Sequence, residues 1–264
     1  MRPGCLTLCV VLVAVSVAVA TKTDGTYVFP GPERKRAEID KVVASMPPVQ
    51  YAAPADRWDH LPRTAAALAK DGGELKILML GDSIVNDTSR SSFELLLQDH
   101  YPKCRIRKTV CVRGSTGCWW YKEPDRLAKY VLAPRPDLIV LGGISHNNDV
   151  DSIVTLIRGV RAKHPADFLV MTPAFGTVDP RDDKQWTEKP DPDGKDFRSR
   201  LVRMAASERI GLLDMTAAWG RYVRTSGKPI DWFKRDVVHA NERGEQVLGR
   251  ILAAHLAPPL PAKR

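Results

Sequence analysis

Two short segments of the chain carry residue types that can cooperate in nucleophilic catalysis. Ser83 follows Gly81 and Asp82 directly after an apolar run, and Asp236 stands three residues before His239 near the other end of the chain. A serine hydroxyl is protonated at neutral pH, so a serine nucleophile needs a base, and histidine suits that role. A carboxylate close by can hold the imidazole ring and stabilise its protonated form. These residues are candidates for a Ser-His-Asp triad.

The remaining histidines are weaker candidates for the base. The sequence contains six histidines. Four of them fit surface, turn or helix-face positions: His60, His100, His164 and His255. His146 lies in a loop after a predicted strand and stays open. Ser83 taken alone could also be a helix N-cap, so the hypothesis depends on the spacing of Asp236 and His239.

Alternating strand and helix patterns predict the elements that must bring these residues together. Strands are predicted at 75–80, 106–112, 137–141, 168–171 and 210–214, and helices at 93–97, 153–160, 197–207 and 242–256. This alternation is typical of parallel βαβ units in an open sheet that helices cover on both faces. Ligands of such sheets bind beyond the carboxyl ends of the strands. Ser83 follows the first predicted strand and meets that condition.

The chain resembles the SGNH (GDSL-type) hydrolase family in three segments. Residues 80–83 match its first block, Leu-Gly-Asp-Ser, and residues 236–239 match its last block, Asp-x-x-His, with Gly244 in the helix that follows. Residues 112–117 are similar to its second block. The resemblance covers roughly residues 74–256 and implies an α/β fold, a flavodoxin-like three-layer α/β/α sandwich with a parallel five-stranded sheet.

The resemblance also implies a role for each matching residue. Ser83 is expected to be the nucleophile, His239 the general base and Asp236 the carboxylate that steadies the imidazolium. The oxyanion hole is expected to include the backbone N–H groups of Ser83 and Gly117, with Gly114 as the alternative to Gly117. The implied reaction needs no metal ion and no other cofactor.

The third block of the family is not matched. Members of the family usually have Gly-x-Asn directly after the third strand, and the asparagine amide completes the oxyanion hole. Here residues 141–143, Leu-Gly-Gly, continue with Ile144 and Ser145, neither of which supplies that donor. We predict that a longer loop returns Asn147 to the hole. The alternative is that Asn147 and Asn148 cap the following helix together with Asp149 or Asp151.

The substrate is predicted from aromatic residues and from the family. Trp119 and Trp120 lie just after Gly117, where they could stack on sugar rings or close a core beneath the loop. Members of the family remove acetyl groups from polysaccharides, so the leading hypothesis is a serine esterase acting on an O-acylated glycan, most simply a carbohydrate acetylesterase. The alternatives are a lipid or aryl esterase, an O-acetyltransferase, or a non-catalytic glycan-binding module.

The ends of the chain are predicted to lie outside this domain. Residues 1–20 combine Arg2, an apolar run and Ala-Val-Ala at positions 18–20, the pattern of a cleaved signal peptide, which predicts a secreted or periplasmic protein without stable membrane insertion. Residues 21–73 are predicted to be a helical extension that wraps the hydrolase-like domain at 74–257. Residues 258–264 are predicted to be a flexible tail.

Composition agrees with one globular domain and excludes several other classes. The chain has 264 residues, 44% hydrophobic and 27% charged, which excludes collagen, a coiled coil and a wholly disordered protein. The formal net charge is +9. This charge is spread along the sequence, so it indicates acidic polysaccharides as partners in preference to nucleic acid. The sequence does not indicate an oligomeric state.

Overall fold

The computed structural model describes residues 21–23, 25–29, 35–174 and 176–261. Within these residues, seven strands form one sheet in the order β1-β2-β4-β3-β5-β6-β7. The strands are β1 (Thr21–Thr23), β2 (Thr26–Phe29), β3 (Glu74–Gly81), β4 (Arg105–Arg113), β5 (Leu138–Leu141), β6 (Asp167–Met171) and β7 (Gly211–Leu213). The five strands from β4 to β7 are parallel, as the sequence predicted.

The prediction of five strands in all was wrong, because β1 and β2 extend the sheet. Both strands come from the segment that was expected to be helical, and β2 pairs antiparallel with β4, with Tyr27 opposite Val112. Tyr27, Val28 and Phe29 are aromatic or β-branched residues, which favour strands. Their pairing covers an edge of β4 that would otherwise present unpaired N–H and C=O groups.

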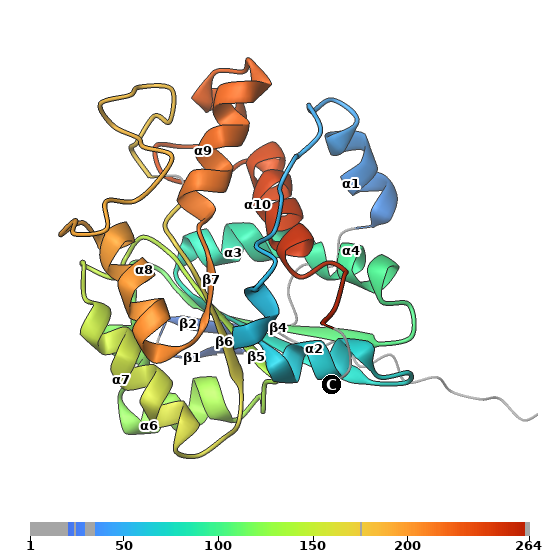
Figure 1. Cartoon of the computed structure of the whole chain (residues 1–264), viewed down its shortest axis with the longest axis vertical. Coiled ribbons are helices and arrows are strands. Elements are labelled where there is room, and N and C mark those ends of the chain that lie inside the picture. The colour runs from blue at the N-terminus through green and yellow to red at the C-terminus, as the bar shows by residue number, and fades with distance from the viewer. Residues whose placement is uncertain (1–20, 24, 30–34, 175, 262–264) are drawn as a thin grey trace, which may run out of the picture.

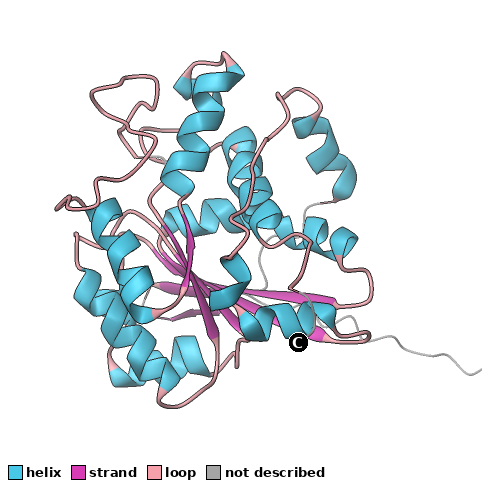
Figure 2. Ribbon diagram, viewed as in Figure 1, coloured by secondary structure: helices cyan, strands magenta, loops and turns pink. Residues whose placement is uncertain are grey.

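Helices cover both faces of the sheet, as Figures 1 and 2 show. The helices and helical turns are α1 (Arg36–Val43), η1 (Arg57–His60), α2 (Pro62–Ala69), α3 (Ser83–Arg90), α4 (Phe93–His100), α5 (Cys118–Tyr121), α6 (Pro124–Arg126), η2 (Leu127–Leu132), α7 (Val150–Arg161), α8 (Phe197–Glu208), α9 (Met215–Ser226), η3 (Ile230–Phe233) and α10 (Glu242–His255). The fold is therefore the predicted three-layer α/β/α sandwich.

Side-chain alternation along β3 divides the core into two clusters. Ile77 and Met79 pack with residues of α2, α4, α9 and α10, whereas Leu78 and Leu80 pack with residues of α5, α7 and α8. Successive side chains of a strand point to opposite faces, so a central strand needs apolar residues at every position. The apolar run at residues 75–80 satisfies that need, and it fixes β3 at the centre of the sheet.

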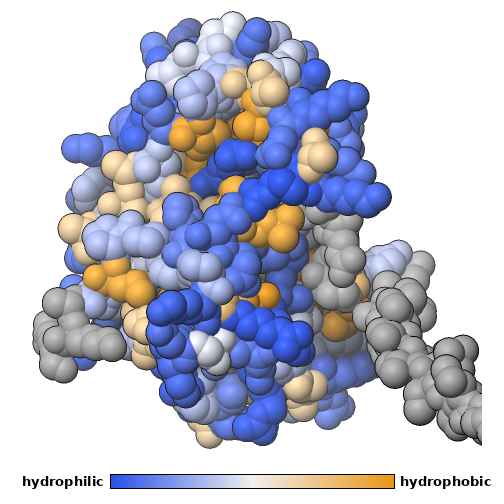
Figure 3. Space-filling view, turned by 90° about the vertical axis from the view of Figure 1, so that its right-hand side faces the viewer, coloured by the Kyte–Doolittle hydropathy of each residue, from blue (hydrophilic) through white to orange (hydrophobic). Residues whose placement is uncertain are grey.

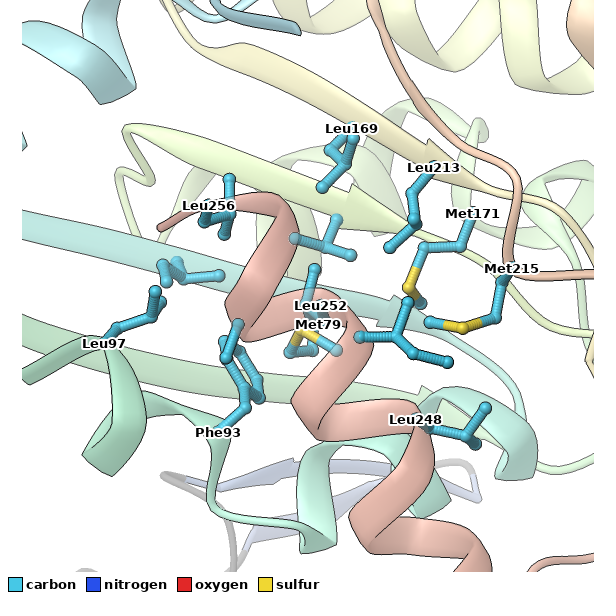
Figure 4. Close-up of a cluster of buried hydrophobic side chains, with 14 of the residues drawn as sticks. Met79, Phe93, Leu97, Leu169, Met171, Leu213, Met215, Leu248, Leu252 and Leu256 are labelled. Atoms are coloured by element: carbon cyan, nitrogen blue, oxygen red, sulfur yellow. The ribbon is translucent and has the colours of Figure 1, made fainter. Parts of the chain in front are cut away.

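Helix α10 packs lengthwise against one face of the sheet. Leu248, Leu252 and Leu256 lie at intervals of four residues and belong to the same buried cluster as Met79 and Met171, and Figure 4 shows Leu252 beside Met79. Residues four apart lie on the same side of a helix, so one apolar stripe covers the sheet. This packing fixes where α10 begins, and the residues just before it include His239.

The two ends of the chain differ in what the structure describes. The predicted signal peptide at residues 1–20 lies outside the described residues. The tail was expected to be flexible, but the Pro259 carbonyl accepts hydrogen bonds from Trp58 and Arg57.

No helix in the described part of the chain is long and apolar enough to cross a membrane. The coloured part of the face in Figure 3 is mostly hydrophilic, with small separate apolar areas.

Candidate active site

The turn from β3 into α3 presents Ser83 at the carboxyl edge of the sheet. Gly81 ends β3, and a Cβ at that position would come within 2.5 Å of the Gly142 carbonyl oxygen and 2.6 Å of the Val85 side chain. Asp82 caps α3, because its carboxylate accepts a hydrogen bond of 2.9 Å from the Ile84 N–H. Ser83 is the first residue of α3. The local sequence Gly-Asp-Ser therefore sets the entry angle of the helix and the place of the serine.

Three side chains from the two ends of the domain meet beside this turn. His239 Nε2 lies 2.8 Å from Ser83 Oγ, and His239 Nδ1 lies 2.8 and 2.9 Å from the two carboxylate oxygens of Asp236. An ionised carboxylate can only accept, so Nδ1 carries the ring proton and Nε2 is left to accept from the serine hydroxyl. This is the geometry that a Ser-His-Asp triad requires.

The loop that carries Asp236 and His239 is closed at its base. The Arg235 N–H donates to the His239 carbonyl at 3.1 Å, and the Asn241 N–H donates to the Phe233 carbonyl at 2.9 Å. Asn241 also caps α10 by accepting from the N–H groups of Arg243 and Gly244. Backbone pairing and the helix cap together determine the shape of this loop.

Backbone donors keep Asp236 ionised. Its carboxylate accepts hydrogen bonds from the N–H groups of Val238 and His239, each at 2.9 Å. These bonds, that of Val238 above all, and the neighbouring imidazole lower the pKa of Asp236 to about 2. The side chain of Asp236 is 49% exposed and that of His239 is 23% exposed. The candidate triad is thus charged at its outer end and open to solvent.

Asp82 has a second contact that the sequence did not reveal. Its other carboxylate oxygen accepts from the N–H groups of Ile144 and Ser145, at 2.8 and 2.9 Å. A Cβ at position 143 would come within 2.4 Å of the Asp82 carboxylate, so only glycine fits there. The fully buried Asp82 joins the loop after β5 to the turn that holds Ser83. The signal in the sequence was the pair of glycines at 142–143.

His146, which the sequence left open, is a buried residue of the loop after β5. Its Nδ1 accepts from the Cys118 N–H at 3.4 Å, so Nε2 carries the proton and donates to the Gly142 carbonyl at 3.0 Å. Burial lowers the pKa of His146, which favours the neutral ring. His146 therefore links two loops and is not placed as a base for Ser83.

Gly117 and Asn147 differ in how they fit the predicted oxyanion hole. Gly117 lies against the loop after β5, where an added Cβ would come within 2.9 Å of the His146 Cα. Asn147 is exposed, with a left-handed φ of 53°, and no hydrogen bond within the described residues joins its amide to the triad. In the alternative, in which the asparagines cap the following helix with Asp149 or Asp151, the residue whose side chain caps α7 is Asp149, which accepts from the Ser152 N–H.

The two tryptophans predicted to bind substrate have different surroundings. Trp120 is buried, with the Arg113 and Arg126 guanidinium groups 5.0 and 4.4 Å from its ring centroid. Only 7% of Trp120 is exposed, so its ring presents little surface to a sugar. Trp119 is half-buried and donates from Nε1 to the Ser145 carbonyl at 3.2 Å. Trp119 is thus the more accessible of the two rings.

A hollow of about 430 Å³ lies beside the outer side of the triad loop. Its lining consists of Thr177, from the loop after β6, and of six residues of the segment before α10: Ile230, Asp231, Lys234, Arg235, Asp236 and Val237. Lys234 spans these two loops, donating from Nζ to the carbonyls of Gly176 and Val237. Val237, 68% exposed, stands at this hollow. A larger hollow of about 710 Å³ lies between α1 and the start of α10 and includes no triad residue.

The cysteines and acidic residues near the site contribute no bridge and no metal cluster. Cys104, Cys111 and Cys118 are buried, and none of these three forms a disulfide. In the described ranges, no group of three or more His, Cys, Asp or Glu side chains is arranged to hold a metal ion.

Comparison with known proteins shows similarity in fold. No protein-family model and no curated protein matches the chain. Axe2, an acetylxylan esterase from Geobacillus stearothermophilus, superposes with a TM-score of 0.55 at 18% identity, covering 74% of this chain and 100% of that chain. CEX, a two-domain esterase active on acetylated mannans, superposes with a TM-score of 0.55 at 15% identity, covering 80% of this chain and 58% of that chain. This chain therefore matches little more than half of CEX.

Three further Axe2 structures are of variants described as catalytic mutants. In them a serine, a histidine or an aspartate is replaced by alanine, and that aspartate lies three residues before that histidine. Asp236 and His239 have the same spacing in this chain.

Proposed function

We propose that this protein is a serine esterase that removes acetyl groups from carbohydrate, with Ser83, His239 and Asp236 as its catalytic triad. The observation that carries the proposal is the continuous chain of hydrogen bonds from Ser83 Oγ through the His239 ring to Asp236. A nucleophile, a base and an orienting carboxylate at these distances are suited to acyl transfer through a covalent intermediate.

The proposed reaction proceeds in two halves. Ser83 Oγ attacks the ester carbonyl carbon while His239 Nε2 takes the hydroxyl proton, and the tetrahedral intermediate collapses as the imidazolium protonates the leaving sugar oxygen. Water then attacks the acetyl-serine with His239 again as base, which releases acetate and restores Ser83. Asp236 stays ionised and stabilises the imidazolium in both halves.

Backbone N–H groups stabilise the oxyanion in this proposal. Ser83 lies at the N-terminus of α3, where the first N–H groups of a helix lack intrahelical partners. Gly117 lies at the N-terminus of α5, against the loop that Asp82 holds. We assign the hole to the N–H groups of Ser83 and Gly117, since donors fixed in advance at the developing charge contribute most to such reactions.

An acetylated polysaccharide is the substrate class that best fits an open site. Half of the Asp236 side chain is exposed, so a bulky polymer can reach the triad without a lid having to move. Axe2 is an acetylxylan esterase and CEX is active on acetylated mannans, which supports acetylated plant-type glycans as substrates. The net charge of +9, of which Arg2 in the predicted signal peptide contributes only one unit, further favours glycans that carry acidic groups.

The Ser83→Ala variant tests the nucleophile. It should lower kcat for an aryl acetate by at least about 10⁴-fold, since removing a triad serine leaves only the catalysis due to binding and the oxyanion hole. Ser207→Ala, on the exposed face of α8, is the matched control and should keep full activity. A Ser83→Ala protein as active as the wild type would rule out the triad.

A panel of esters separates the proposed activity from its alternatives. The wild type should release acetate from acetylated xylan and mannan and should hydrolyse acetyl esters faster than long-chain acyl esters. Preference for long chains would indicate a lipid esterase, and transfer of acetyl to an added sugar in place of water would indicate an O-acetyltransferase. Failure of a fluorophosphonate to label Ser83 would indicate a non-catalytic glycan-binding module.

We also propose that the protein is secreted. The support is the sequence pattern of residues 1–20, with small residues at positions 18 and 20. Determination of the N-terminal sequence of the exported protein should give Thr21 as its first residue, and retention of Met1 in mature protein would contradict the proposal.

A further inference from the structure

We infer that Asp87 is a positioning residue that holds the loop of residues 235–240, and so His239, at working distance from Ser83. The inference rests on the proposed function. It goes beyond the triad, because the hydrogen-bond partners of the Asp87 carboxylate are Arg235 and Ala240 and not a triad side chain.

Asp87 fastens both ends of the loop that carries Asp236 and His239. One carboxylate oxygen accepts from the Arg235 guanidinium at 2.9 Å, and the other accepts from the Ala240 N–H at 2.9 Å. Arg235 and Ala240 are the residues that flank the Asp-x-x-His segment. The Asp87 side chain is fully buried, with 0% exposure. A single buried carboxylate thus holds the two residues between which both remaining triad members lie.

The same helix supplies the nucleophile and this anchor. Ser83 and Asp87 are four residues apart in α3, so they lie on the same side of the helix, one turn apart. An α-helix is rigid over one turn because its backbone hydrogen bonds fix that spacing. The separation of Ser83 from the loop is therefore set within α3 and does not depend on the packing of distant elements.

A second buried carboxylate reinforces the first through the same guanidinium. Glu245 in α10 lies 3.7 Å from the Arg235 nitrogen that binds Asp87, and it also binds Arg90 of α3 at 2.8 Å. Burial raises the pKa of Asp87, and the charge of Arg235 is the main opposing influence. A buried charge is tolerated where it is paired and hydrogen-bonded, so Arg235 is the residue that lets Asp87 act as an ionised anchor.

Asp167 provides a matched comparison for a merely structural role. It is a buried carboxylate at the start of β6, where it accepts from the N–H and the hydroxyl of Thr64 at 2.7 and 2.8 Å. Burial raises its pKa as it does that of Asp87. Asp167 lies at the amino end of its strand, away from the edge that carries Ser83. Replacement of either aspartate disturbs a buried polar contact, and only one of them adjoins the triad loop.

The test measures kcat, KM and thermal stability for Asp87→Asn and Asp167→Asn with a soluble aryl acetate. Asp87→Asn should lower kcat about 100-fold and change KM less than about threefold, because a misplaced base affects the chemical step in particular. Both variants should lower Tm by similar amounts, because each disturbs one buried carboxylate. Asp167→Asn should nevertheless leave kcat within about twofold of the wild type. Retained kcat in a folded Asp87→Asn protein would overturn the inference, as would an equal loss of kcat in both variants.

Arg235→Met gives a second readout that does not depend on the folding of Asp87→Asn. The Arg235 side chain is 41% exposed, and its replacement leaves Asp87 the hydrogen bond from the Ala240 N–H, so a thermal melt is recorded to show that the variant is folded. If the ion pair positions the loop, Arg235→Met should lower kcat about tenfold in the wild type and should change kcat little further in Asp87→Asn. Full activity of Arg235→Met, or losses that multiply in the double variant, would overturn the inference.

The wild type and Ser83→Ala distinguish failure of this inference from failure of the proposed function. If the wild type hydrolyses no ester in a Ser83-dependent manner, the esterase proposal fails, and the positioning role fails with it. If Ser83-dependent hydrolysis is present and Asp87→Asn keeps its kcat, the esterase proposal stands and the positioning role alone is overturned.

Discussion

The two ends of helix α10 use polar side chains in different ways. The helix has 14 residues and is about 21 Å long, so its ends lie at opposite edges of the sheet. At its start, Asn241 donates to the Lys234 carbonyl and the buried Glu245 lies 3.7 Å from Arg235. Arg235 and Asp236 in the neighbouring loop are partly open to solvent. At its end, His255 is fully buried and Tyr51 Oη lies 2.8 Å from its Nδ1.

The contacts at the end of α10 attach the extension and the tail to the domain. Tyr101 donates to the Leu256 carbonyl, Arg57 to the Ala257 carbonyl and Trp58 to the Pro259 carbonyl. None of these groups belongs to the candidate site. The comparison teaches that similar polar contacts serve positioning at one end of the helix and stability at the other. Substitutions at the start should therefore change kcat, and substitutions at the end should change the free energy of unfolding.

Among variants near the two ends of α10, Asp236→Asn in the loop before the helix is expected to change kcat the most. An amide oxygen at this position can still accept from the Val238 N–H. The amide NH2 beside His239 Nδ1 donates to that nitrogen, which favours the tautomer with its proton on Nε2, and the neutral amide does not stabilise the imidazolium. The expected fall in kcat is about 10³–10⁴-fold, by analogy with loss of the aspartate in other triads. Tm should change little, because the side chain is half exposed. Steady-state kinetics with an aryl acetate and a thermal melt check both parts.

Asp231→Asn is the matched control for that variant. Asp231 is exposed and lines the same hollow as Asp236, but it makes no bond to His239. It should keep kcat within about twofold of the wild type, as most exposed substitutions outside a site do. An equal loss in both variants would show that the charge of the hollow, and not the contact with His239, accounts for the effect.

Much of the fold could be predicted because the central strands leave an unambiguous pattern. A strand buried on both faces is apolar throughout, as at residues 75–80, and helices between such strands imply parallel crossovers. Strand β2 could not be predicted in the same way. It is short, and its partner β4 lies about eighty residues further along the chain, so its pairing depends on contacts that a local pattern does not contain.

The candidate site was predicted where its chemistry is local in the sequence. Asp236 and His239 share one loop, and Ser83 follows a strand, so residue type and spacing were enough to suggest the triad. Asp82 and Asp87 were missed as positioning groups because their partners at 144–145 and 235–240 are remote in sequence. Asp87 has one sequence signal, since it lies one helical turn after Ser83.

A smaller effect, and one confined to stability, is expected from titration of His255. Burial, with a lesser contribution from Arg57, lowers the pKa of His255 to about 4 in the folded protein, against about 6.5 for an unperturbed histidine. Between these values the unfolded state binds a proton that the native state does not. The free energy of unfolding should therefore fall as the pH is lowered from about 6.5 to about 4, by about 3 kcal/mol in total.

His255→Gln isolates this contribution. Urea unfolding of the wild type and the variant at pH 7, 5.5 and 4.5 should show the difference in stability between them shifting in favour of the variant as the pH falls. At pH 7 both proteins should have the same kcat, because His255 lies far from Ser83. Parallel pH dependences would contradict the assignment, and a loss of kcat would contradict the separation of the two ends of α10.

The smallest effect is expected at the active edge itself, from Asn147→Gly. Asn147 is exposed, and glycine adopts its φ of 53° without strain, so kcat should stay within about threefold of the wild type. His146→Phe is the matched variant, since the new ring can stack on Phe197 as His146 does, 5.5 Å between centroids, but it lacks the bonds to Gly142 and Cys118. It should lower kcat about tenfold, because those bonds hold the loop beside the proposed oxyanion hole. A loss of about 10²–10³-fold in Asn147→Gly is instead what removal of an oxyanion-hole donor produces. That result would assign the amide of Asn147 to the hole, and it would mean that even an exposed side chain at this edge takes part in the chemistry.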